Sequence, residues 1–135
     1  MYRVMLGNLV AEDRGKTVGV RILPDGKIEQ TGQRSGKWWG MEATNLSTNV
    51  ATIRLDGTFT SEGQGLITTN DGESMSVKIY GVGWPIVKGL AIKERGAAFP
   101  QTTSPKFAQA NKLNFVFEFE SDEKGDYLLK VWEWK

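Results

Sequence analysis

Two glutamates, Glu62 and Glu94, are the residues of this chain best placed to do chemistry, because each interrupts a segment of alternating apolar and polar side chains. The sequence contains no histidine and no cysteine. The usual general base at neutral pH, thiolate nucleophiles and Ser-His or Cys-His pairs are therefore excluded. A carboxyl group held in an apolar interior can act as a general acid or base. Glu62 and Glu94 are thus the candidate catalytic residues, with Arg95 and Tyr80 as candidates to stabilise developing charge.

The orientation of Glu62 depends on which face of its strand is buried. Alternation over residues 58–67 puts Gly63 and Gly65 on one face and Glu62 and Gln64 on the other. An inward glycine face leaves space beside the backbone, whereas the opposite orientation brings a carboxylate and an amide inside. The simpler alternative has both polar side chains in water, with glycines that only bend the strand. Gln64 is kept as a candidate ligand-binding residue.

Glu94 continues the apolar face formed by Leu90 and Ile92, so an unbroken strand would carry it inward. An inward carboxylate needs a partner or becomes protonated. The favoured alternative is a bulge at residues 93–95 that returns all three charged side chains to water. Polar residues that could assist either glutamate are Tyr80, Lys78, Arg34 and Gln101.

Aromatic side chains supply the apolar part of a candidate binding site. Phe115, Phe117 and Phe119 share one face of a strand, while Glu118 lies on the other. Trp132 lies on the C-terminal strand and could plug the barrel, stack on a sugar or pack against a second subunit. We expect these three phenylalanines and Trp132 to contact a ligand.

Adjacent tryptophans bear on the quaternary structure. Trp38 and Trp39 point to opposite faces if both lie in one strand. One of the two rings is then expected at the outer surface or at an interface. This spacing predicts a homo-oligomer.

Antiparallel strands are the elements that must position these side chains. Turn sequences recur at 24–26, 56–57, 70–72 and 124–125, between segments rich in Val, Ile, Thr and aromatics, which is typical of hairpins. The pattern predicts about eight to ten strands, at residues 3–12, 17–22, 27–36, 37–44, 50–55, 58–69, 74–79, 86–99, 113–119 and 127–134. A hydroxyl cap and a following proline predict a short helix over 103–111.

The positions of the glycines favour a barrel over a sandwich. The chain of 135 residues contains 16 glycines, and many lie inside predicted strands. Glycines in strands allow the sharp bends that a small closed barrel needs, and closure removes exposed sheet edges. We therefore predict an all-β fold: a closed antiparallel barrel forming one domain over residues 1–135.

Composition excludes several function classes. A net charge of +1 is far from the basic excess of a dedicated nucleic-acid binder. The apolar N-terminal run is too short for a signal peptide, and no window is long enough for a membrane helix. Phosphate-loop and calcium-loop motifs are absent. We expect a cytoplasmic protein without metal or cofactor and without nucleic-acid or membrane partners.

Several segments together resemble a known group of proteins. They are 19–27, 62–65, 81–83, 95–97 and 131–135. Their order is similar to that in a family of uncharacterised small prokaryotic proteins that look like lipocalin-type, calycin-like or allene-oxide-cyclase-like barrels. The resemblance implies a closed barrel whose apolar lumen holds a small molecule, and oligomers are common among such barrels. In allene oxide cyclases a buried carboxylate assists cyclisation of a fatty-acid epoxide without metal or organic cofactor.

Three functions follow as hypotheses. The leading one is a barrel that binds a small, largely apolar molecule in its lumen. The second is a cofactor-free isomerase or cyclase that uses Glu62 or Glu94 in the lumen. The third is a structural or oligomeric interaction module whose barrel is plugged by large side chains.

Overall fold

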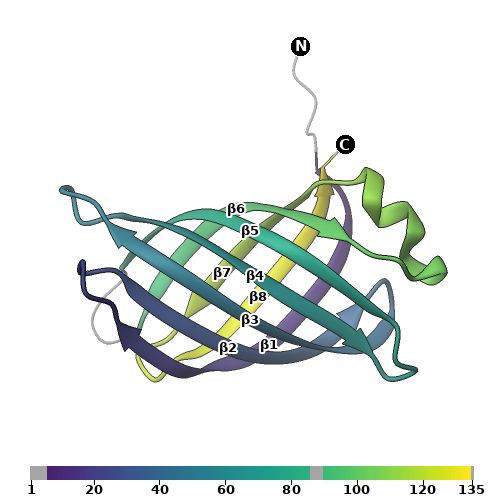
Figure 1. Cartoon of the computed structure of the whole chain (residues 1–135), viewed down its shortest axis with the longest axis horizontal. Coiled ribbons are helices and arrows are strands. Elements are labelled where there is room, and N and C mark those ends of the chain that lie inside the picture. The colour runs from purple at the N-terminus through teal and green to yellow at the C-terminus, as the bar shows by residue number, and fades with distance from the viewer. Residues whose placement is uncertain (1–5, 86–89, 135) are drawn as a thin grey trace, which may run out of the picture.

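The computed structural model describes residues 6–85 and 90–134. In this part of the chain, eight antiparallel strands close into one barrel in the order β1 to β8 (Figure 1). The strands are β1 (Leu6–Ile22), β2 (Ile28–Trp38), β3 (Met41–Ile53), β4 (Phe59–Thr69), β5 (Ser74–Pro85), β6 (Ile92–Gln101), β7 (Phe115–Ser121) and β8 (Asp126–Trp134). A short 3-10 helix, η1 (Pro105–Lys112), connects β6 to β7. The predicted closed antiparallel barrel with one short helix is confirmed.

Pairing between the first and last strands closes the barrel. β1 pairs with β2 on one side and with β8 on the other. β1 has 17 residues and β3 has 13, and each replaces two shorter predicted strands. The pairing of β1 with β2 is regular through the charged stretch 12–14 and shifts register between Thr17 and Gly19. The first residues of the predicted strands 3–12 and 86–99 lie outside the described residues.

Alternation along the strands separates the lumen from the outer surface. On β7, Phe115 and Phe117 are buried and Glu118 is exposed, which confirms the predicted faces. On β4, Ser61 is buried and Glu62 is exposed, so the glycine face is the inward one. A one-residue slip would exchange these faces.

Inward glycines make room for polar side chains of the neighbouring strand. A Cβ on Gly65 would lie 3.2 Å from Asn45 Oδ1, and a Cβ on Gly63 would collide with Asn49. A Cβ on Gly36 would collide with the carboxylate of Asp13. The space beside the glycine backbone therefore holds polar groups.

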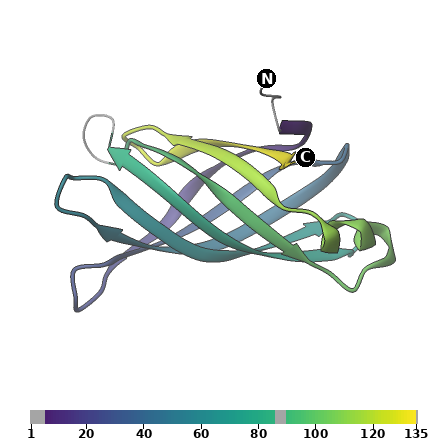
Figure 2. The same ribbon diagram turned by 90° about the horizontal axis from the view of Figure 1, so that it is seen from above.

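Aromatic rings and η1 close one end of the barrel. Phe107 and Ala110 of η1 are buried, and the Phe107 ring centroid lies 5.6 Å from that of Trp39. Figures 1 and 2 show η1 at the end opposite the β1–β2 and β3–β4 hairpins. Trp38 is buried in the core, whereas Trp39 sits in the β2–β3 turn with a φ of 49° and packs inward. The expectation that one of these rings faces outward is therefore wrong, because the positive φ turns Trp39 out of strand alternation.

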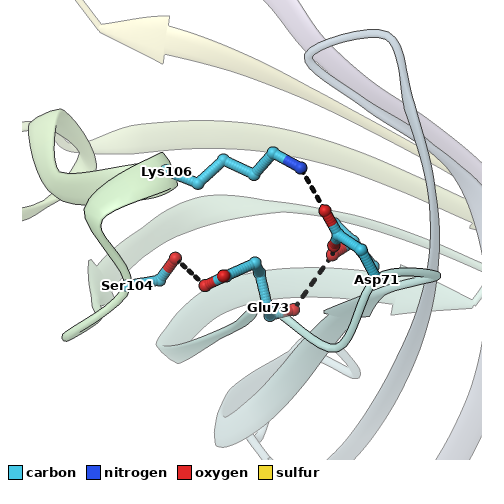
Figure 3. A network of polar contacts seen from close by, with 5 residues as sticks. Asp71, Glu73, Ser104 and Lys106 are labelled. Carbon is cyan, nitrogen blue, oxygen red and sulfur yellow. Dashed lines mark hydrogen bonds and ion pairs between the residues drawn. The ribbon is translucent and has the colours of Figure 1, made fainter.

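Polar contacts fasten η1 to the β4–β5 turn (Figure 3). Lys106 forms an ion pair with Asp71, and Ser104 donates a hydrogen bond to the Glu73 carboxylate. Hydrogen bonds from Lys106 and Thr69 lower the pKa of Asp71 to about 2. Ser104 occupies the N-cap position but makes no side-chain cap bond, so its hydroxyl joins the helix to the barrel instead.

Candidate functional site

The lumen contains a cavity of about 70 Å³, which we call the inner cavity. Its wall combines polar residues of β2, β3 and β6 with apolar residues of β5 to β8. The residues that line it are Gln30, Arg34, Trp38, Asn45, Asn49, Val77, Ile79, Ile92, Glu94, Ala98, Phe115, Phe117, Phe119, Leu129 and Val131.

Glu94 faces into this cavity from β6. Pairing of β6 with β5 runs without a register shift from Ile92 to Gln101, so the predicted bulge at 93–95 is wrong and the alternation carries the carboxylate inward. Glu94 Oε1 accepts a hydrogen bond of 2.9 Å from Ser61 Oγ on β4. Burial raises the pKa of Glu94, while the Ser61 hydrogen bond and the positive charge of Arg34 oppose the rise.

Asp13 is the centre of a second buried polar group. Its side chain is completely buried and accepts hydrogen bonds of 3.2 and 3.0 Å from Trp38 Nε1 and one of 3.4 Å from Asn45 Nδ2. Arg34 Nε lies 4.0 Å from Asp13 Oδ2. Burial raises the pKa of Asp13, and Trp38, Asn45 and Arg34 oppose it in that order. Asp13 is not among the residues predicted from the sequence, although its alternation with Ala11 is a signal of an inward side chain.

Arg34 also contacts β8, the strand on the other side of β1. Its guanidinium carbon lies 5.6 Å from the centroid of the Tyr127 ring, within the range of a cation–π contact. Burial raises the pKa of Tyr127, and the charge of Arg34 opposes this. The cation of Arg34 is therefore placed between a buried carboxylate and an aromatic face.

Some buried polar atoms of the cavity wall make no hydrogen bond with the described residues. They include Arg34 Nε, Asn45 Oδ1 and Asn49 Oδ1. Arg34 is 7% exposed and Asn45 is 1% exposed. Because a buried polar group without a partner costs free energy, a bound molecule that paired with these atoms would recover part of that cost.

A second cavity of about 230 Å³ lies at the hairpin end, and we call it the mouth. It shares Gln30, Asn49, Ile92 and Glu94 with the inner cavity. The other residues that line it are Val20, Ile22, Ile28, Ala51, Ile53, Gly57, Phe59, Ser61, Pro85 and Leu90. Ile22 is 68% exposed and Ile53 is 53% exposed, so the mouth reaches solvent. An apolar passage thus leads from water to the polar wall.

The predicted site residues divide between the two sides of the barrel wall. Glu94, Phe115, Phe117 and Phe119 line the inner cavity, as does the auxiliary residue Arg34. The remaining predicted residues are Glu62, Gln64, Tyr80, Arg95 and Trp132.

None of these remaining residues lines the inner cavity or the mouth. Glu62 and Gln64 are exposed, and Glu62 pairs across strands with exposed Tyr80 on the outer surface. Exposed Arg95 lies over the Trp84 ring at 5.9 Å. Trp132 is half-buried. Glu94 is therefore separated from Glu62, Tyr80 and Arg95 by the sheet.

Metal and membrane features were also considered. Among residues 6–85 and 90–134, no three acidic side chains gather in a way that could hold a metal ion. Within the same ranges, no helix has the length and apolar character to cross a bilayer.

Fold and site together define a class: a closed eight-stranded antiparallel β-barrel with a polar wall inside its lumen. The chain is similar to a crystal structure of a conserved protein of unknown function from Rhodopseudomonas palustris, with 15% identity and a TM-score of 0.79 over 98% of this chain and 99% of that one. It is also similar to a protein of unknown function from Clostridium acetobutylicum, with 16% identity and a TM-score of 0.78 over 95% and 97% of the two chains.

A third similar structure is a beta-barrel like protein from Acinetobacter baumannii, with 15% identity and a TM-score of 0.70 over 96% of this chain and 95% of that one. At these identities the likeness shows the fold. No family description and no curated protein matches the sequence. The small β-barrel fold is thus supported, while the lipocalin-type and cyclase-like resemblance stays a prediction.

Proposed function

We propose that this protein binds a small molecule with a largely apolar body, which enters through the mouth and places a polar group in the inner cavity. The observation that carries the proposal is the set of buried polar atoms without a hydrogen bond beyond the apolar mouth, Asn45 Oδ1 and Asn49 Oδ1 above all. Ligand sites are typically apolar clefts with a few polar groups that fix orientation.

The sizes of the two cavities indicate which part of the ligand each one holds. The inner cavity of about 70 Å³ has room for about two waters, which suits a small head group. The mouth is larger and carries aliphatic side chains such as Ile22, Ile28 and Ile53. Covering these side chains with an apolar body contributes about 25 cal/mol for each Å² removed from water.

A fluorescent apolar probe tests this proposal. N-phenyl-1-naphthylamine brightens when it leaves water, and we expect saturable binding to the wild-type protein. Ile53→Glu places a charge in the mouth and should weaken binding by about tenfold or more. Thr52→Glu is the matched control, because Thr52 is exposed one residue away on the outer face. Absence of binding to the wild type, or equal loss in both variants, would contradict the proposal.

A second candidate function rests on Glu94. A carboxyl with a raised pKa at a cavity wall suits a cofactor-free isomerase or cyclase that moves a proton on a bound substrate. Arg34 could stabilise developing negative charge, since it lines the same cavity and Arg95 does not. Proton abstraction by Glu94 and its return would exchange a substrate hydrogen with solvent.

Deuterium exchange tests this candidate. The molecule retained by the purified protein is incubated with the protein in heavy water, and its mass is followed. Glu94→Gln should abolish deuterium uptake, and Glu62→Gln should leave it unchanged because Glu62 is exposed outside the barrel. Equal uptake in wild type and Glu94→Gln would remove the enzymatic candidate and leave the binding function.

A plugged interaction module has less support. Large side chains fill the end of the barrel near η1, but the inner cavity and the mouth remain between the other walls.

A further inference from the structure

The charged side chains inside the barrel differ in their partners. Arg34 and Asp13 form a buried pair of opposite charges, with Trp38 and Asn45 donating to the same carboxylate. This pair is neutral as a unit. Glu94 is the other acidic side chain of the lumen wall in the described residues, and its hydrogen bond comes from the neutral hydroxyl of Ser61.

Glu94 also stands where a ligand must pass. It lines both the mouth and the inner cavity, whereas Arg34 lines the inner cavity alone. A molecule that enters through the mouth therefore meets the carboxylate of Glu94 before the guanidinium. Negative charge at this position repels anions and attracts cations, and the low dielectric of the site strengthens both effects.

Two amide oxygens of the cavity walls favour a hydrogen-bond donor. Asn45 donates its amide nitrogen to Asp13, which leaves Oδ1 as an acceptor without a partner. Asn49 Oδ1 is a second such acceptor and lines both cavities. An ammonium group carries three donors and no acceptor, so it could pair with Glu94 and with these amide oxygens together.

Aromatic rings provide a further contact for a cation. Phe117 and Phe119 line the inner cavity together with Glu94. The negative face of an aromatic ring attracts ammonium groups, and more so when water is excluded. The wall thus combines a carboxylate, amide oxygens and phenyl rings around one small space.

We propose that the ligand is a cationic amphiphile, in which a protonated amine pairs with Glu94 and an aliphatic body occupies the mouth. This inference rests on the proposed binding function and names the ligand class for the same site. Carboxylate ligands are disfavoured, because an anion that enters through the mouth meets the carboxylate of Glu94 before the guanidinium of Arg34, which already faces Asp13.

The experiment compares three ligands with the same body: octylamine, octanol and octanoate. Each is added as a competitor of N-phenyl-1-naphthylamine for the wild-type protein at pH 7, where octylamine is protonated as lysine is. The loss of probe fluorescence gives the affinity of each competitor. We expect octylamine to bind about tenfold or more tightly than octanol, as hydrogen bonds to charged groups permit, and octanoate to bind most weakly.

Two variants then test whether Glu94 causes the preference for octylamine over octanol. Glu94→Gln should bring octylamine to the affinity of octanol while octanol binding persists, which also shows that the variant folds. Glu62→Gln, on the outer face of β4, should keep the amine preference. Since the three-ligand comparison uses wild-type protein, it gives an answer even if Glu94→Gln does not fold.

The outcomes separate this inference from the proposed function. If octanol or octanoate binds as tightly as octylamine, the amine inference is overturned and the binding function stands. If the amine preference survives Glu94→Gln in a folded variant, Glu94 is not the counter-ion and the inference is overturned. If the probe and all three ligands fail to bind, the proposed function fails as well.

Discussion

Gly81 on β5 lies directly against the carboxylate of Glu94 on β6: a Cβ at position 81 would stand 3.0 Å from Glu94 Oε2. The missing side chain at Gly81 provides the space in which Glu94 turns toward Ser61. The same arrangement of a glycine beside an inward polar side chain occurs at Gly65, which leaves room for Asn45. The polar wall of the lumen is thus built by pairing an inward polar side chain with a glycine on an adjacent strand.

Gly81→Ala should disturb this arrangement. The added methyl group crowds the Glu94 carboxylate, and overpacking of this kind costs about 1 kcal/mol or more. Thermal unfolding should show the loss, together with weaker octylamine binding. Gly19→Ala is the control, because its Cβ would meet Thr31 Cβ at an ordinary 3.9 Å. Equal stability of the two variants would contradict a space-making role for Gly81.

Asp13→Asn should be strongly destabilising. It removes an acceptor oxygen that Trp38, Asn45 and Arg34 face, and a buried donor left without its acceptor costs about 1–3 kcal/mol. Glu12→Gln changes an exposed neighbour whose contact with Lys130 is a surface pair of 3.8 Å, so its effect should be small. Urea unfolding of both variants measures the difference. A loss below about 1 kcal/mol for Asp13→Asn would show that the buried pair does not stabilise the fold.

The raised pKa of Glu94 predicts how stability depends on pH. In the unfolded chain Glu94 titrates near 4.5, but in the folded protein it holds its proton to higher pH. The unfolded state therefore loses this proton first, and the free energy of unfolding falls as pH rises from 4.5 through the raised pKa. Asp13 acts in the same direction from 3.8 upward. The lowered pKa of Asp71 has the opposite effect at lower pH. It raises the free energy of unfolding as the pH increases from about 2 to 3.8.

Glu94→Gln tests this pH dependence. The variant should show a shallower decline in the free energy of unfolding above pH 4.5 than the wild type. Glu62→Gln should follow the wild-type curve. Urea unfolding at several pH values measures the free energy of unfolding of all three proteins. If Glu94→Gln shows the same dependence on pH as the wild type, a group other than Glu94 causes the decline.

The predicted homo-oligomer has a candidate surface on the outside of the barrel. Tyr80 and Phe99 are 47% and 42% exposed and contact each other edge to face at 6.0 Å. Light scattering should give a multiple of 15.0 kDa for the wild type. Phe99→Lys should lower the mass toward one chain, and Gln101→Lys, an exposed residue on the same strand, should not. A wild-type mass of one chain would refute the oligomer.

Alternation made much of the fold predictable. The strand of Phe115, Phe117 and Phe119 was assigned the correct inward face, because each apolar ring alternates with a polar or smaller residue. The in-strand glycines indicated a closed barrel, and the structure shows their role in the packing of the lumen. Proline at position 105 marked the start of η1.

The polar wall was harder to predict. Asp13 lies between Glu12 and Arg14, so three consecutive charges suggest a turn rather than a strand with one carboxylate buried. Burial of Asp13 depends on donors far along the chain, Trp38 and Asn45, which become neighbours only when the sheet closes. For Glu94 the rule that charges avoid the interior favoured a bulge, but Ser61 and the space at Gly81 offset part of the cost of burial.

Native mass spectrometry of the protein purified from its own cells tests the central claim most directly. Comparing the intact and denatured masses shows whether the barrel retains a small molecule. We expect an added mass that is released on denaturation, is lost in Ile53→Glu and persists in Thr52→Glu. A protein that carries no added mass, and that also fails to bind N-phenyl-1-naphthylamine and the three octyl ligands, would contradict that claim.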